Sequence, residues 1–364
     1  MYEPRYLITH NILRYIGQID AAREMITNAA LVPAWEAKFR ADAVSRMVHH
    51  GTHLEGNALS LEQAQKLVAV DVTDAAKAGE KAGVVGRERD IQEVINYRKV
   101  IDWIDQHGKS GSQPRQYSPD MLKETHRLTV DRILDSERSG VYRKVAVVVK
   151  NSRTGEVSFK PPPYIEVPYQ IDEFFSWLNS EAGRQHHPIL RAGITHYELV
   201  RIHPFIDGNG RAARAMAFLI LYSEGYDVKR FFSLEEYFDL NAASYYQALQ
   251  SVGSSEEFDL TYWLEYFTLG LAAELDRIKQ QVLKLSRDLS LKKKLGKQIA
   301  LTERQIKILE TMESNDGQIL SSDLEKILPE VSVDTILRDL KDLIKKGLIK
   351  KRGKTKGAHY QLVE

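Results

Sequence analysis

Residues 203–214 read His-Pro-Phe-Ile-Asp-Gly-Asn-Gly-Arg-Ala-Ala-Arg, and they join a polar, glycine-rich loop directly to an apolar segment. The apolar segment runs from about Arg211 to Glu224 and predicts a helix, because Gly225 follows at a position where helices commonly end. Since it is apolar on nearly every side, this helix is expected at the buried centre of a helical bundle.

The first turn of the predicted helix carries two cations. Arg211 and Arg214 lie three residues apart, hence on one face, and positive charge there opposes the helix dipole. A bound anion would relieve this opposition. The backbone N–H groups of Gly208, Asn209 and Gly210 can form a concave nest for an anion at the same helix end. The sequence therefore predicts a phosphate site in this loop.

Two other residues of the loop suit chemistry at a phosphate. Asp207 is a hard oxygen ligand for Mg²⁺ held between phosphates, and His203 can act as a general base near neutral pH. Both fit attack of a hydroxyl on a nucleotide phosphate, with arginine and Mg²⁺ stabilising the developing charge. A calcium loop is excluded, because the twelfth position from Asp207 is Phe218 and not glutamate. Phe205 is expected to be a core anchor.

At every defined position, residues 203–214 match the Fic motif His-Pro-Phe-x-Asp/Glu-Gly-Asn-Gly-Arg-x-x-Arg. The chain thus resembles Fic-domain proteins, most of which are protein adenylyltransferases. The resemblance implies a mainly α fold, a Fic helical-bundle core with a β-hairpin flap. It implies transfer of AMP from ATP to a Ser, Thr or Tyr hydroxyl of a target protein or of the chain itself. By the same resemblance, His203 deprotonates the hydroxyl, Asp207 holds Mg²⁺, and the nucleotide is bound by Gly208, Asn209, Gly210, Arg211, Ala212, Ala213 and Arg214.

Leu54-Glu55-Gly56-Asn57 is similar to the end of the inhibitory helix of many Fic proteins, with the pattern Ser/Thr-x-x-x-Glu-Gly/Asn. By this resemblance Glu55 pairs with Arg214 and blocks productive placement of the ATP γ-phosphate, because a carboxylate competes directly for an arginine pocket built for phosphate. Gly51 stands where the pattern has Ser or Thr, which leaves open how firmly the helix is held. The alternative is that Glu55 only precedes a glycine helix cap. We favour inhibition.

Tyr245 and Tyr246 lie on a predicted helix after the motif. A Tyr-Tyr pair at this place contacts adenine in many Fic sequences, and aromatic faces stack on bases. Packing in the core is the alternative for each tyrosine. His49 and His53 have the spacing of metal ligands, but no nearby motif completes a ligand set, so no metal site is predicted there.

A β-hairpin is expected before the motif. Residues 141–149 are rich in β-branched side chains and predict a strand, residues 151–155 a turn, and residues 156–159 the return strand, which three prolines end. By resemblance, the hairpin at 141–160 is the flap on which the target protein docks by strand addition. A hairpin without a ligand is the alternative.

The C-terminal residues 301–364 resemble a winged helix-turn-helix domain. The expected helices are 302–313, 321–328 and 332–346, and the expected wing is 348–362. The basic turn of the wing suits phosphate contacts. In the helix expected to face a DNA groove, however, three residues are acidic, namely Asp334, Asp339 and Asp342. Contact with DNA and contact with protein therefore both stay open.

Length and composition indicate two or three domains in 364 residues. The expected division is 1–87, a helical region with the inhibitory motif; 88–270, the Fic core; 271–300, a connecting helix; and 301–364. Residues 1–30 are expected to begin the helical region as an amphipathic helix. A net charge of +1 gives no global field for nucleic acid or membrane.

The absence of cysteine excludes disulfides, thiolate catalysis and zinc–cysteine sites, and it fits a reducing cytoplasm. No signal peptide or membrane span is predicted, so a cytoplasmic location is expected. Three other functions stay open: removal of AMP with Glu55 positioning water, transfer of another nucleotide or phosphocholine by the same residues, and DNA-binding regulation with the Fic domain as nucleotide sensor. The oligomeric state stays open, a homodimer included.

Overall fold

The computed structural model describes residues 2–29, 31–108, 115–150, 157–253, 258–293, 301–315, 317–320, 328, 331–353 and 359–363. The chain forms two compact units, residues 1–29 with 36–281, and residues 30–35 with 282–364. One boundary lies shortly before the long helix α2 (Pro33–His53), and the other two fall within α2 and within α13 (Thr261–Lys293). The finer division expected from the sequence stays a prediction.

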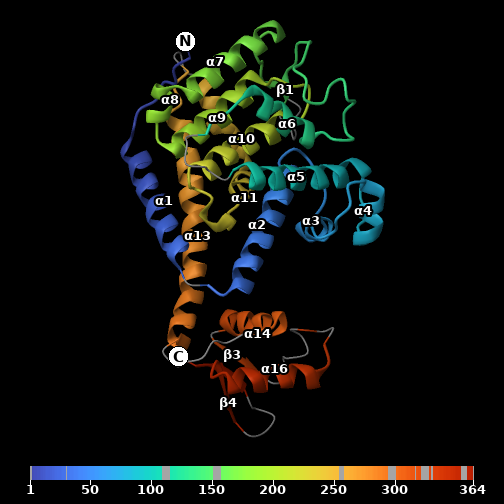
Figure 1. Cartoon of the computed structure of the whole chain (residues 1–364), viewed down its shortest axis with the longest axis vertical. Coiled ribbons are helices and arrows are strands. Elements are labelled where there is room, and N and C mark those ends of the chain that lie inside the picture. The colour runs from blue at the N-terminus through green and yellow to red at the C-terminus, as the bar shows by residue number, and fades with distance from the viewer. Residues whose placement is uncertain are drawn as a thin grey trace. The chain divides into compact units, whose positions relative to one another are not determined.

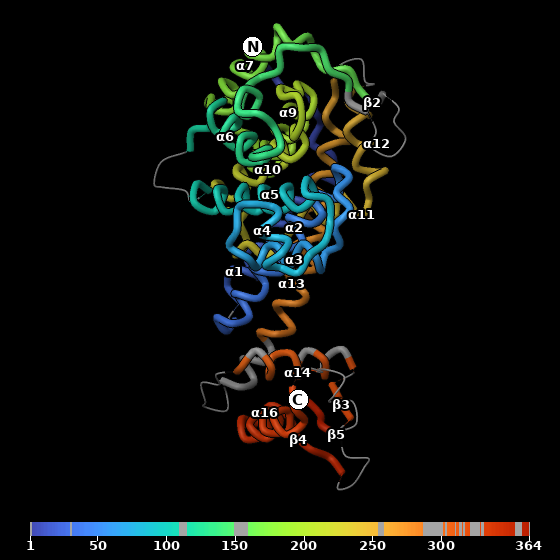
Figure 2. Tube along the Cα trace, turned by 90° about the vertical axis from the view of Figure 1, so that its right-hand side faces the viewer, coloured from blue at the N-terminus to red at the C-terminus, as the bar shows by residue number. Residues whose placement is uncertain are grey.

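The first unit is a bundle around α10 (Asn209–Ser223), the motif helix. This helix packs against α9 (Pro188–Ile202), α5 (Glu88–His107) and α6 (Pro119–Thr129), which lie around it in Figure 2. Every residue from Arg211 to Ser223 is buried, as its apolar composition predicted. Gly225 follows with φ of 82°, a left-handed conformation that suits glycine, and it ends the helix as expected.

The remaining elements of this unit surround that centre (Figure 1). They are α1 (His10–Asn28), α3 (Leu61–Val68), α4 (Ala75–Ala82), η1 (Tyr164–Glu166), α7 (Val167–Asn179), α8 (Glu181–Gln185), η2 (Val228–Arg230), α11 (Leu234–Leu240) and α12 (Ala242–Gly253). The expected start of the first helix was wrong, because Thr9 caps α1 by accepting a hydrogen bond from the Ile12 N–H. Before that cap the chain is extended, and the Arg5 carbonyl accepts from the N–H of Leu260.

The hairpin is shorter than predicted. It consists of β1 (Val149–Lys150) and β2 (Val157–Phe159), which are antiparallel. Residues 141–148 form no strand, because the backbone N–H of Arg143 donates to the Pro204 carbonyl of the motif loop and is not available to a strand partner. The expected turn, residues 151–155, lies outside the described residues. The return strand ends before the three prolines, as predicted.

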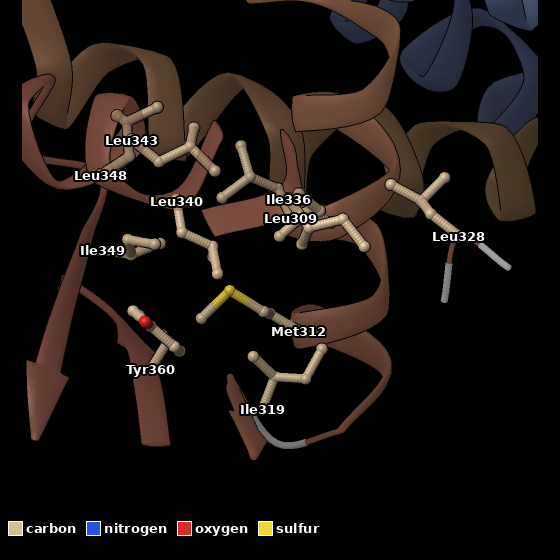
Figure 3. Close-up of a cluster of buried hydrophobic side chains, with 11 residues drawn as sticks. Leu309, Met312, Ile319, Leu328, Ile336, Leu340, Leu343, Leu348, Ile349 and Tyr360 are labelled. Carbon is tan, nitrogen blue, oxygen red and sulfur yellow. The ribbon is translucent and has the colours of Figure 1, made fainter. Parts of the chain in front are cut away.

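The second unit contains a three-stranded antiparallel sheet and two described helices. Its elements are α14 (Glu303–Ser314), β3 (Gln318–Leu320), α16 (Val333–Lys345), β4 (Ile349–Arg352) and β5 (His359–Leu362), with strand order β3-β5-β4. Figure 3 shows Met312, Leu340 and Tyr360 from α14, α16 and β5 in one apolar core. The sequence missed β3, and the expected helix 321–328 lies, except for Leu328, outside the described residues. The winged-helix interpretation stays a prediction.

Within the described ranges, no helix combines the length and apolarity needed to cross a membrane.

Candidate active site

The motif loop is fixed at both ends by its own backbone and in the middle by a buried ring. His203 ends α9 with φ of 51°, and Gly208 precedes α10 with φ of 75°. Between them, the side-chain amide of Asn209 donates to the Phe205 carbonyl (2.9 Å) and accepts from the Phe205 N–H (2.8 Å). Phe205 is fully buried, so the predicted core anchor is confirmed. The loop is therefore held rigidly between the two central helices.

His126 of α6 fixes this loop from outside the motif. Its ring stacks on Phe205 with 3.7 Å between centroids. Its Nδ1 accepts from the Gly140 N–H, and its Nε2 donates to the Asp207 carbonyl, each at 2.9 Å. Burial lowers the pKa of His126 to about 4, so the ring is neutral at pH 7, as this donor and acceptor pair requires.

His203 has the protonation state of a general base. Its Nδ1 lies 3.3 Å from the carbonyl of Val200, which can only accept, so the proton is on Nδ1 and Nε2 keeps its lone pair. Burial lowers the pKa of His203 to about 4. The side chain is only partly buried and therefore still accessible. A neutral, oriented imidazole is suited to taking a proton from a hydroxyl.

Arg143 supports His203 from the segment that leads to β1. Its Nε donates to the His203 carbonyl (2.8 Å), and its Nη2 donates to the carbonyls of Pro162 (2.6 Å) and Ile202 (3.4 Å). Since these carbonyls include the last ones of α9, the guanidinium caps that helix end. Arg143 thus joins the start of the flap region to the motif loop.

Asp207 is surrounded by cations. Its Oδ1 accepts from the Gly208 N–H (2.6 Å), and its Oδ2 accepts from Arg89 Nη2 on α5 (2.7 Å). Burial alone would raise the pKa of Asp207, but Arg211 and Arg89 lower it below its ordinary value. Arg211 is buried and also lies 3.5 Å from Glu93 of α5. Arg89 and Glu93 were not among the site residues predicted from the sequence. Their i, i+4 spacing was the available signal, but it does not say which loop α5 faces.

Glu55 lies beside Arg214, where the inhibitory pattern places it. Arg214 is buried, and its Nη2 donates to Glu55 Oε1 and to the Gly51 carbonyl, each at 2.9 Å. Gly210 in the first turn of α10 allows this approach, because a Cβ there would lie 2.3 Å from Glu55 Oε1. The carboxylate therefore occupies the helix end that was predicted to bind an anion.

Gly51 departs from the Ser/Thr of the pattern for a steric reason. A Cβ at Gly51 would lie 2.4 Å from Cε1 of Tyr97, whose hydroxyl donates to the buried Glu235 (2.7 Å). The hydroxyl of Thr52 donates back to the Val48 carbonyl and does not replace the missing group. Instead, the Gly51 carbonyl itself contacts Arg214. The backbone of α2 thus holds the arginine together with Glu55.

The predicted nest is smaller than expected. Of the three N–H groups predicted to form the nest, that of Gly208 binds Asp207, so those of Asn209 and Gly210 remain for a ligand. Ala212 and Ala213 are buried in the bundle, and their contact with a nucleotide stays a prediction. The Nε of both Arg211 and Arg214 is buried without a hydrogen-bond partner among the described residues. Such unsatisfied donors are costly unless an anion binds them.

The two tyrosines differ in their surroundings. Tyr245 is buried, stacks on Phe238, and shares a hydrogen bond of 3.0 Å with His196. It therefore packs in the core, beside the buried His196. Tyr246 is half-buried, and its hydroxyl donates to the carbonyl of Leu54, next to Glu55 (3.2 Å). Neither position gives direct support to adenine stacking.

The histidine cluster near the C-terminal end of α2, His49, His50 and His53, contacts a carboxylate group. Nδ1 of His50 and Nδ1 of His53 both lie 2.8 Å from the carboxylate of Asp239 on α11. Across the described part of the chain, no group of three or more acidic or histidine ligands is arranged for a metal ion. The cluster connects the C-terminal end of α2, which Glu55 follows by two residues, to the bundle.

A single carboxylate at the site still fits Mg²⁺. This ion is commonly held by one or two carboxylates together with phosphate oxygens of a substrate, and Asp207 stands beside the unsatisfied donors of Arg211. Displacement of Arg89 would free Oδ2 of Asp207 for the ion.

Residues 116–221 match the model of the Fic/DOC family. Curated relatives include protein adenylyltransferase fic-1 of Caenorhabditis briggsae, 31% identical over 182 residues (49% of this chain, 32% of the relative). Another is protein adenylyltransferase Fic of Culex quinquefasciatus, 24% identical over 225 residues (60% of this chain, 40% of the relative). The chain thus spans less than half the length of these relatives.

Solved structures agree on the fold. A Fic family protein from Desulfovibrio desulfuricans superposes with a TM-score of 0.64 at 22% identity, covering 100% of this chain and 98% of that one. A Fic-1 fragment from Caenorhabditis elegans gives 0.55 at 24% identity, covering 76% and 73%. Residues 116–221 therefore match the Fic/DOC family model, and the fold of the chain is that of these solved Fic proteins.

Proposed function

We propose that the protein is an adenylyltransferase that moves AMP from ATP to a Ser, Thr or Tyr hydroxyl of a protein, which includes the chain itself as a target. The observation that carries this proposal is a neutral, oriented His203 on the same short loop as the buried donors of Arg211 and Arg214. A base beside a phosphate site suits attack on a phosphorus atom. The curated names of the relatives support adenylyl transfer.

In this reaction, His203 Nε2 takes the proton of the target hydroxyl as its oxygen attacks the α-phosphorus of ATP. The bond from that phosphorus to the bridging oxygen breaks, and pyrophosphate leaves. Arg211, Arg214 and the first N–H groups of α10 bind the phosphate oxygens and stabilise the charge that develops on them. Mg²⁺, held by Asp207, would neutralise the phosphate chain.

Glu55 inhibits this reaction in our proposal. Its carboxylate binds the guanidinium that would otherwise bind a phosphate, and both acceptors cannot take the same donors of Arg214. The contact is the one that the sequence resemblance predicted. Activity then requires α2 to withdraw Glu55 from the start of α10.

The target segment docks on the hairpin in this proposal. A two-stranded sheet has unpaired edges that can add a further strand. Val145 and Val148 are about half exposed in the segment that leads to β1, and Ile206 of the motif loop is 41% exposed. These side chains would bring an extended target segment close to His203.

The donor and the group transferred are tested with labelled ATP. In a Glu55→Gly background, α-³²P-ATP is expected to label protein, whereas γ-³²P-ATP is not, because pyrophosphate leaves. Adding His203→Ala should abolish the label, while His107→Ala, which removes an exposed histidine of α5, should leave it unchanged. Label from the γ-phosphate would contradict the proposal.

A further inference from the structure

The second unit contains a helix with one strongly basic face. On α16, Arg338, Lys341 and Lys345 are exposed, and their spacing of three and four residues places them on one side. The opposite side carries Ile336, Leu340 and Leu343, which are buried in the core of the unit (Figure 3). The basic side is therefore the face that α16 presents to solvent.

Two of the three acidic residues of this helix have partners within the unit. Asp339 is buried and accepts from Arg304 Nε of α14 (2.8 Å). Asp342 accepts from Gln305 Nε2 of α14 (2.7 Å) and pairs with Lys346 (2.5 Å). Of the three acids that argued against nucleic-acid binding, Asp339 is thus buried, and Asp342, whose side chain is 45% exposed, is paired with Lys346. The third, Asp334, is exposed in the first turn.

The positive charge continues beyond the helix. Lys351 and Arg352 are exposed on β4, which begins four residues after α16 ends. Residues 338–356 contain nine lysines and arginines but two acidic residues. Over the described residues, none of the five exposed cations Arg338, Lys341, Lys345, Lys351 and Arg352 forms an ion pair. The near-zero charge of the whole chain therefore conceals a local basic surface.

We propose that this basic surface, α16 with β4, binds duplex DNA through its phosphates. A helix of 13 residues is about 20 Å long, and the major groove admits a helix of this width. Phosphate contacts are made by lysine and arginine, whereas lysine is depleted at protein–protein interfaces. Val333 and Ile344, each about two-fifths exposed, are the large apolar side chains at the margins of this surface. The proposal is independent of the chemistry at His203.

The test is binding of the full chain to a fluorescent 20-base-pair duplex at several salt concentrations. Five phosphate contacts predict a slope of about −4.5 in log affinity against log salt, hence roughly a 500-fold loss between 50 and 200 mM. Lys341→Gln/Lys345→Gln should weaken binding at least tenfold at 100 mM and reduce the slope by about 2. Lys307→Gln on α14 is the control and should bind like the wild type.

A variant that should strengthen DNA binding distinguishes an effect of charge from a loss of folding. Asp334→Asn removes the acid on the exposed side of α16 and should strengthen duplex binding severalfold, with the unfolding midpoint unchanged. No duplex binding at 50 mM salt, or binding that the double variant does not weaken, would overturn the proposal. Binding of polyglutamate but not of duplex would overturn it as well and would indicate an acidic protein partner.

Discussion

Replacing Glu55 by glutamine tests the ion pair with Arg214 while keeping the length of the side chain. Removing one partner of a fully buried pair costs about 3–5 kcal/mol. Arg214 is 1% exposed but Glu55 is 32% exposed, so water screens part of the charge, and the Gly51 carbonyl still accepts from the guanidinium. We therefore expect a loss of about 1–2 kcal/mol. In a unit of this size, that lowers the unfolding midpoint by roughly 2–8 °C.

The assay is thermal unfolding followed by tryptophan fluorescence. Three of the four tryptophans, Trp103, Trp177 and Trp263, lie in the first unit, and none lies in 301–364. The matched control is Glu62→Gln, which breaks an exposed pair with Lys66 on α3 and should leave the midpoint nearly unchanged.

The unfolding midpoint measured with ATP is a second readout, in which the Glu55→Gln variant should gain more stability than the wild type. Once the carboxylate is gone, Arg214 can bind phosphate, so saturating ATP should stabilise Glu55→Gln more than the wild type. An unchanged or raised midpoint for Glu55→Gln, together with equal stabilisation of both proteins by ATP, would refute the reasoning.

Three further predictions follow from the charges around the motif loop. Arg89→Gln frees Oδ2 of Asp207, so calorimetry in the presence of a non-hydrolysable ATP analogue should show Mg²⁺ binding severalfold more tightly; equal or weaker binding would contradict the competition. Because burial lowers the pKa of His203 to about 4, transfer should stay constant from pH 8 to about 5 and fall only near pH 4, whereas a limb near 6.5 would show that the base is another group. Burial also lowers the folded-state pKa of His126 to about 4, so between pH 6.5 and 4 the unfolded chain binds more protons. Stability should therefore decrease as the pH falls, by about 1.4 kcal/mol per pH unit for each of His126 and His203, and urea unfolding that is constant from pH 7 to 5 would be inconsistent with their burial.

The clustering of the polar residues of the loop could be predicted because these residues are contiguous in the sequence. His203, Asp207, Arg211 and Arg214 occur within one loop and one helix start, so their spacing alone brings them together. The expectation that the motif helix is buried was likewise readable from its composition, since no side of it is polar enough for solvent.

The residues that support the loop could not be predicted. Arg89, His126 and Arg143 come from three other segments, and only the packing of the bundle brings them to the motif. The prediction of a long first strand at residues 141–149 was wrong for a related reason. β-propensity describes a backbone free to pair with a strand, whereas Arg143 uses its N–H and its guanidinium to hold the motif loop.

The acidic residues of α16 show the same limit. Their sequence positions suggested a helix unsuited to DNA, because the partners of Asp339 and Asp342 lie on α14, some 35 residues earlier. The buried stripe Ile336, Leu340 and Leu343 was readable from the sequence, but the ion pairs beside it were not.

The measurement that tests the central claim most directly is transfer of label from α-³²P-ATP with Mg²⁺ to protein. It compares the wild type, Glu55→Gly and Glu55→Gly/His203→Ala, each checked for folding by thermal unfolding. The account predicts weak label in the wild type, strong label in the single variant and none in the double variant. Equal label in all three proteins, or no increase when Glu55 is removed, would contradict the claim that the protein is an adenylyltransferase in which Glu55 is the inhibitor and His203 the general base.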